Sequence, residues 1–252
     1  MRKIAALPSM LTLANLLCGF ASLRYAAEGR YSEGSFAAAA WMVLLAMVFD
    51  ALDGKVARLM RAESKFGAEL DSLADVVSFG VAPAYLVMQM AMEAGLKHQR
   101  LVWLGCMVYV MCAALRLARF NVETELDEES HKWFSGLPSP AAAGQVVSLV
   151  ILHQHVQAHV DFIPRLLPTV AFFTGVLMAS RVRYPHLISR FLRGRHAYAE
   201  FVFLCITGLL VAMHKEITLA AGFTIFTVAG VLGVAHKLVF HREKDEEEEP
   251  VF

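Results

Sequence analysis

Long apolar runs constrain this chain more than any other feature of its sequence. They recur along all 252 residues and are separated by short charged segments. Hydrophobic residues make up 57% of the chain and charged residues 18%, whereas soluble domains are usually about 45–50% apolar and about 25% charged. Apolar runs of this length are typical of helices that cross a membrane. The sequence therefore predicts an all-α integral membrane protein.

Hydropathy divides the chain into about eight predicted membrane spans. They lie near residues 10–27, 35–60, 68–94, 101–120, 141–157, 162–181, 198–213 and 217–240. The fifth span is the weakest, because its end reads HQHVQAH and is polar. The first run resembles a signal peptide, but no clear cleavage site follows it, so a retained helix is expected.

The distribution of positive charge predicts an orientation. When the spans alternate, most of the 23 lysine and arginine residues fall on the side that holds the N-terminus. The positive-inside rule then predicts a multi-pass protein of the cell (inner) membrane with both termini in the cytoplasm. The formal net charge is zero, so bulk charge predicts no nucleic-acid partner.

Four aspartates interrupt the apolar pattern in the stretch FDALDGKVARLMRAESKFGAELDSLAD, which runs from residue 49 to residue 75. Asp50 and Asp53 share one helix face, and Asp71 and Asp75 share another, because helical positions three or four apart are neighbours. Two facing helices would bring four carboxylates together at the predicted cytoplasmic side. One aspartate at mid-bilayer costs about 2.5–3.5 kcal/mol, so a compensating cation is expected. Oxygen ligands in this number suit Mg²⁺ or Mn²⁺, and four carboxylates can hold two ions.

Two other interpretations of the aspartates remain open at this point. They could serve as helix caps and form salt bridges with the basic residues of the same stretch, Lys55, Arg58, Arg61 and Lys65. Alternatively, they could line the pathway of a divalent cation transporter. Transporters often contain paired repeats with acidic residues near mid-bilayer, whereas these acids cluster on one side and no paired repeat is visible.

The arrangement Asp50-x2-Asp53-Gly54-x2-Ala57-Arg58-x8-Gly67-x3-Asp71-x3-Asp75 is identified as the signature of the CDP-alcohol phosphotransferase family. The resemblance implies a six-helix membrane core, to which this chain adds two C-terminal transmembrane helices. It also implies a site for two Mg²⁺ or Mn²⁺ ions and a homodimer. Members of this family transfer a phosphatidyl-type group from a CDP-linked lipid to an alcohol and release CMP.

The resemblance implies a role for each fixed position of the signature. The four aspartates, Asp50, Asp53, Asp71 and Asp75, would bind the metal ions, and Asp75 would also be the general base. Four further positions would bind the substrate, with the first three contacting the cytidine diphosphate: Gly54, Ala57, Arg58 and Gly67. Small residues also let membrane helices pack closely, which is the alternative interpretation of the glycines and the alanine.

Three other stretches resemble bacterial and archaeal phosphatidylserine synthases. They are LPSMLTLANLLCGFASL (7–23), ALRLARFNV (114–122) and FSGLPSPAAAG (134–144). The resemblance implies transfer of the phosphatidyl group from CDP-diacylglycerol, held among membrane lipids, to L-serine. Glycerol 3-phosphate or inositol phosphate as acceptor, and an archaeal-type lipid as donor, remain alternatives.

A serine site needs a cation for the carboxylate of the amino acid. Arg116 and Arg119 lie near the predicted cytoplasmic end of the fourth span, and Asn121 can add a polar contact. These three residues are the candidate acceptor-binding residues. The arginines could instead be interfacial residues whose charged ends reach toward water.

The expected division of the chain has three parts. Residues 1–185 form the catalytic membrane core, and residues 186–241 form a basic connector with two additional helices. Residues 242–252 include the run DEEEEP and form an acidic cytoplasmic tail.

Overall fold

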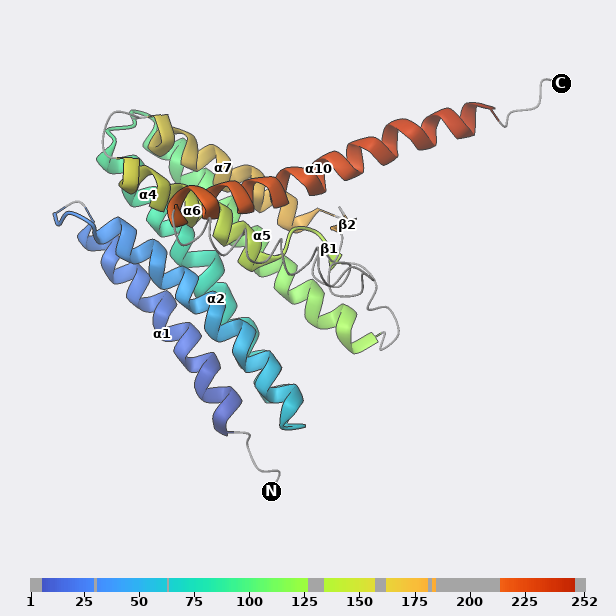
Figure 1. Ribbon diagram of the computed structural model, residues 1–252, viewed down its shortest axis with the longest axis horizontal. Coiled ribbons are helices and arrows are strands. Elements are labelled where there is room, and N and C mark those ends of the chain that lie inside the picture. Colours follow the sequence, from blue (N-terminus) through green and yellow to red (C-terminus); the bar gives the residue numbers. More distant parts are fainter. Residues whose placement is uncertain are drawn as a thin grey trace.

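The computed structural model describes residues 6–29, 31–62, 64–126, 134–156, 162–180, 183–184 and 214–247. Most of them are helical (Figure 1). The elements are α1 (Ala6–Glu28), α2 (Ser35–Leu59), α3 (Lys65–Asp75), the π-helical segment η1 (Val76–Val81), α4 (Ala82–Glu93), α5 (Gln99–Leu126), α6 (Ser139–Val156), α7 (Phe162–Ala179) and α10 (Lys215–Glu247). Two short strands, β1 (Phe134–Ser135) and β2 (Arg183–Tyr184), form one antiparallel pair.

Six of the described helical segments are long and apolar enough to cross a membrane. They are 6–28, 35–59, 65–93, 99–122, 162–179 and 215–233. The chain is thus a helical, multi-pass membrane protein, as the apolar runs predicted. Helix α6 is not among the six, because its last turn holds His153 and His155. The predicted seventh span, 198–213, lies outside the described residues.

Helices α1 and α2 lie side by side and antiparallel at one edge of the bundle (Figure 1). Many of the buried residues of the two helices are small, and Ala26, Ala39 and Ala46 are fully buried. Small residues permit close approach of membrane helices. Larger apolar side chains of α1, such as Leu17 and Phe20, point outward, where they would face lipid.

A π-helical segment interrupts the third predicted span. Residues 65–93 form α3, η1 and α4 in succession. Pro83 explains the interruption, because proline has no N–H for the carbonyl of residue 79 and its ring clashes with that carbonyl in a regular helix. The hydroxyl of Tyr109, on α5, instead donates a hydrogen bond of 2.9 Å to the Phe79 carbonyl. The sequence predicted a helix here but not the π-helical segment.

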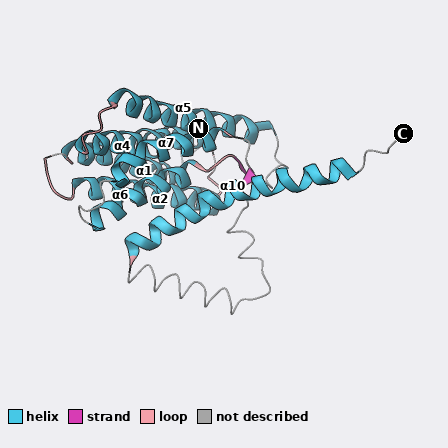
Figure 2. Ribbon diagram, turned by 90° about the horizontal axis from the view of Figure 1, so that it is seen from above, coloured by secondary structure: helices cyan, strands magenta, loops and turns pink. Residues whose placement is uncertain are grey.

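Helix α10 packs across α6 and then extends beyond the bundle (Figure 2). Phe223 lies directly against Gly144, where a Cβ atom would overlap its ring. Gln145 Nε2 donates a hydrogen bond of 3.1 Å to Thr224 Oγ1. The helix continues to Glu247, past residue 240, where the last span was predicted to end. Lysine and glutamate favour helix, so the helix continues into the predicted acidic tail.

Candidate active site

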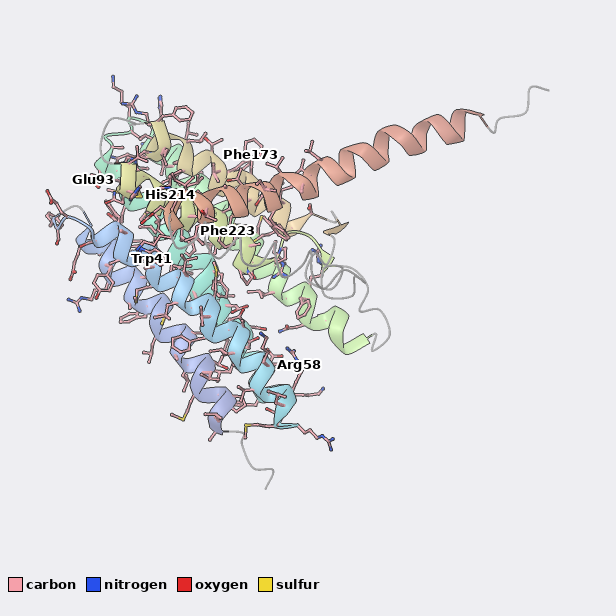
Figure 3. All side chains as sticks on the ribbon, in the orientation of Figure 1. Trp41, Arg58, Glu93, Phe173, His214 and Phe223 are labelled. Atoms are coloured by element: carbon pink, nitrogen blue, oxygen red, sulfur yellow. The ribbon has the colours of Figure 1, made fainter. Side chains whose placement is uncertain are left out.

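The chain reverses direction between the two aspartate pairs. Helix α2 ends at Leu59 and α3 begins at Lys65. The Ser64 side chain caps α3 by accepting a hydrogen bond of 3.0 Å from the Gly67 backbone N–H. Arg58 lies near the end of α2, far from Glu93 and His214 at the other end of the bundle (Figure 3). The short link brings carboxylates near the end of α2 close to a carboxylate of α3, as the spacing of the aspartates predicted.

Three of the four predicted metal ligands converge in the structure. Asp50, Asp53 and Asp71 each offer a carboxylate oxygen, and these oxygens lie within 4.8 Å of one another. Asp75 is outside this group of three and lies one turn after Asp71. It is only 7% exposed and interacts electrostatically with Asp50 and Asp71.

The environment of these carboxylates fits a bound cation. Asp71 Oδ1 is buried and has no hydrogen-bond partner among the described residues. Within the described part of the chain, no lysine or arginine forms an ion pair with any of the four aspartates. The salt-bridge interpretation therefore has no support there. Clustered carboxylates that form no ion pair repel one another, and a divalent cation bound by hard oxygen ligands relieves that repulsion.

A cavity of about 270 Å³ opens beside the carboxylates. Six of the predicted site residues line it, namely Asp53, Gly54, Ala57, Arg58, Gly67 and Asp71. A Cβ atom at Gly54 would meet only the Arg58 guanidinium, at 3.7 Å and beyond. Gly54 therefore faces open space, and its lack of a side chain leaves room for a ligand next to the backbone of α2.

Arg116 lies close to the aspartates and is only 8% exposed. Its side chain donates a hydrogen bond of 2.7 Å to Ser139 Oγ at the start of α6. Arg116 also interacts electrostatically with Asp75 and Asp50. Its Nε atom has no hydrogen-bond partner among the described residues. A buried arginine with an unused donor beside an acidic cluster differs from the exposed arginine that the interfacial interpretation requires.

The two other candidate acceptor-binding residues have protein partners. Arg119 donates hydrogen bonds of 3.3 Å to the carbonyl oxygens of Ala179 and Ser180. Ala179 is the last residue of α7, and Ser180 follows it. The Asn121 side chain and Ser72 on α3 form a hydrogen-bonded pair, with Nδ2 donating to Oγ at 2.9 Å. Both residues therefore connect α5 to neighbouring elements near the site.

The loop before α6 places Ser139 against Arg116. Gly136 has a φ of +88°, and a Cβ atom there would overlap the Met178 carbonyl oxygen. Only glycine tolerates both the left-handed backbone and this close approach. The Leu137 N–H donates a hydrogen bond of 3.1 Å to the Leu177 carbonyl oxygen. The end of α7 thus holds the loop in place.

Sequence reasoning missed two polar residues of α1 that contact the aspartates. Thr12 Oγ1 lies 2.8 Å from Asp53 Oδ2, and Asn15 Nδ2 donates a hydrogen bond of 3.2 Å to Asp75 Oδ1. Both side chains are buried. The sequence did contain a pattern that could have identified them. Thr12 and Asn15 are polar residues three positions apart, on one face of an otherwise apolar run.

Comparisons with known proteins agree with this geometry. A CDP-diacylglycerol–serine O-phosphatidyltransferase from Helicobacter pylori is 32% identical over 240 residues, which cover 94% of this chain and 95% of the relative. A protein of the same description from Methanocaldococcus jannaschii is 35% identical over 184 residues, 73% of this chain and 76% of the relative. An archaetidylserine synthase from Methanothermobacter thermautotrophicus is 36% identical over 184 residues, 72% of this chain and 70% of the relative.

The family model described as CDP-alcohol phosphatidyltransferase matches residues 5–180, a range that includes the aspartates, the cavity lining and Arg116. Because that match covers well over half of the chain, the protein belongs to the CDP-alcohol phosphatidyltransferase family.

Proposed function

We propose that this protein transfers the phosphatidyl group of CDP-diacylglycerol to the hydroxyl of L-serine and forms phosphatidylserine and CMP. The observation that carries the proposal is the cluster of Asp50, Asp53 and Asp71 beside a cavity next to Gly54 and Arg58. The names of the relatives from Helicobacter pylori and Methanocaldococcus jannaschii support serine as the acceptor. Family membership favours this transferase over a divalent cation transporter.

Asp50, Asp53, Asp71 and Asp75 would hold two Mg²⁺ or Mn²⁺ ions. The oxygens within 4.8 Å of one another and the unpartnered Asp71 Oδ1 support this assignment. Ions bound there would neutralise the diphosphate of the substrate and stabilise the departing CMP. The Arg58 guanidinium lines the same cavity and would pair with a phosphate oxygen.

Asp75 would act as the general base. Its carboxylate takes the proton from the acceptor hydroxyl, and the hydroxyl oxygen forms a bond to the phosphorus that carries diacylglycerol. The bond from that phosphorus to the CMP oxygen breaks, and CMP leaves with the electron pair. The low exposure of Asp75 supports this role, because few water molecules can compete for the base.

On the acceptor side, Arg116 would bind the carboxylate of serine. Its buried, unused Nε donor supports this role, since an arginine and a carboxylate form strong charge-assisted hydrogen bonds. Arg119 and Asn121 would complete the acceptor site from the same helix. Their bonds to the end of α7 and to Ser72 would hold the surrounding elements in position.

The proposal includes a place in the cell and an assembly state. The active site and both termini would lie on the cytoplasmic side of the cell (inner) membrane, as the excess of positive residues on that side suggests. The protein would be a homodimer. Cysteine accessibility in intact cells tests the orientation, and light scattering of the purified protein tests the dimer, which a monomer mass would exclude.

The decisive experiment measures CMP release by the purified protein with a panel of acceptors and donors. We expect release with L-serine and CDP-diacylglycerol, and little with glycerol 3-phosphate or inositol phosphate. The name of the Methanothermobacter relative makes CDP-archaeol a useful second donor. Rapid CMP release with glycerol 3-phosphate and none with serine would show that glycerol 3-phosphate is the acceptor and serine is not.

A further inference from the structure

Helix α1 approaches the π-helical segment η1 closely at one point. A Cβ atom at Gly19 would overlap Ser78 in η1, so glycine is needed for this contact. Asn15 lies one turn earlier on α1 and is 0% exposed. A buried polar side chain in an apolar interface is costly unless it forms hydrogen bonds, so the contacts of Asn15 need an explanation.

Asn15 is fixed at both its backbone and its side chain. Ser78 Oγ donates a hydrogen bond of 3.0 Å to the Asn15 carbonyl oxygen. The Asn15 amide donates to Asp75 Oδ1 at 3.2 Å. An ionised carboxylate only accepts hydrogen bonds, so the NH₂ end of the amide must face Asp75. The Asn15 Oδ1 atom then has no partner among the described residues, and α1 keeps that energetically unfavourable group.

The position of Asp75 makes this contact important. Asp75 is the last residue of α3, and the π-helical segment η1 begins at the next residue. It is therefore at a point where the regular helix geometry changes. Its Oδ1 is occupied by Asn15, and no described residue forms a hydrogen bond with its Oδ2. One oxygen is thus fixed, and the other is left for a ligand.

We infer that Asn15 is a positioning residue that orients the Asp75 carboxylate so that Oδ2 faces the acceptor hydroxyl. This inference rests on the function proposed above, in which Asp75 is the base. Asn15 itself touches no reacting atom and acts through Asp75. Its loss would therefore slow the chemical step and leave the binding of both substrates nearly unchanged.

The test compares Asn15→Ala with Ser22→Ala in the purified full-length protein. Ser22 is a matched control, because it is also on α1, fully buried and without a hydrogen-bond partner among the described residues. It lies about 10 Å further along the helix, away from the aspartates. We expect Asn15→Ala to lower kcat about 10–100-fold, with KM for serine and for CDP-diacylglycerol changed by less than about twofold. Ser22→Ala should leave all three values within about twofold of wild type.

Two further measurements separate positioning from a general loss of structure. Thermal unfolding in detergent and CMP binding by calorimetry should be similar for wild type and Asn15→Ala. If Asn15→Ala unfolds on purification, Asn15→Ser is measured against the same criteria, since its hydroxyl is too short to replace the amide. A folded variant with kcat near wild type, a change confined to KM, or an equal loss of kcat in Ser22→Ala would overturn the inference.

The same data distinguish failure of the inference from failure of the proposed function. If wild type releases CMP with serine but Asn15→Ala keeps its kcat, only the positioning role is wrong. If wild type releases no CMP with serine, the proposed function fails, and the role of Asn15 in orienting a base for serine fails with it.

Discussion

Two helix contacts in this protein bury polar groups, and they differ in what lies around those groups. At the first, Thr12 and Asn15 of α1 contact Asp53 and Asp75. At the second, Gln145 of α6 donates a hydrogen bond to Thr224 of α10. Both contacts contain buried polar atoms without partners among the described residues, namely Asn15 Oδ1 at the first and Gln145 Oε1 at the second.

The difference lies in charge and in open space. The contact of α1 surrounds clustered carboxylates next to a cavity of about 270 Å³. The contact of α10 joins neutral groups, and Phe223 fills the space against Gly144. A hydrogen bond between membrane helices is thus not in itself a sign of function, since such bonds also hold helices together. Clustered carboxylates that form no ion pair among the described residues, together with space for a ligand, distinguish the first contact and support it as the proposed site.

The largest expected effect comes from removing the base at the first contact. Asp75→Asn keeps the shape of the side chain and removes its ability to take a proton, so CMP release should fall about 10²–10⁴-fold. Thermal unfolding should stay near wild type, because the amide fills the same volume. The measurement is CMP release with L-serine at saturating substrate. A fully active Asp75→Asn protein would remove Asp75 from the mechanism.

A smaller effect is expected from Thr12→Val, which removes a hydrogen bond to a proposed metal ligand. The Thr12 hydroxyl has one proton and two nearby acceptors, Asp53 Oδ2 at 2.8 Å and the Pro8 carbonyl oxygen at 3.1 Å. The nearer, charged carboxylate is the stronger acceptor. Without this bond, Asp53 is less well oriented, and the dissociation constant for Mn²⁺ should rise about 10–100-fold. Calorimetric titration with Mn²⁺ measures it directly, and an unchanged affinity would contradict the role of Thr12.

The smallest effect is expected from the same substitution at the second contact. Thr224→Val removes the acceptor for Gln145 Nε2, and such bonds between membrane helices contribute about 0.6 kcal/mol on average. The unfolding midpoint should therefore fall slightly, while Mn²⁺ affinity and CMP release stay within about twofold of wild type. A loss of activity as large as that of Thr12→Val would show that α10 influences the site and would remove the distinction between the two contacts.

The local part of the site could be predicted from the sequence. The spacing of the aspartates and the short link between their helices predicted that Asp50, Asp53 and Asp71 would converge. The same spacing placed Gly54 and Arg58 near these acids. Helical periodicity governs such contacts, and it can be read directly from residue order.

The missed features depend on contacts between residues far apart in the chain. Asn15 and Asp75 meet only because α1 packs on η1, and Arg119 reaches the end of α7 only in the folded bundle. Periodicity within one helix gives no information about such pairs. The π-helical segment had a local cause in Pro83, but the hydrogen bond from Tyr109 to the Phe79 carbonyl joins residues on different helices.

The length of α10 has a practical consequence for labelling the protein. Its candidate membrane span ends at Gly233, and the helix continues to Glu247 for about 20 Å more. The final residues, HREKDEE, are charged and favour water over hydrocarbon. A fluorophore or affinity tag attached after Glu247 would therefore be carried on a helical extension, clear of the lipid and of the carboxylates that we propose perform the reaction.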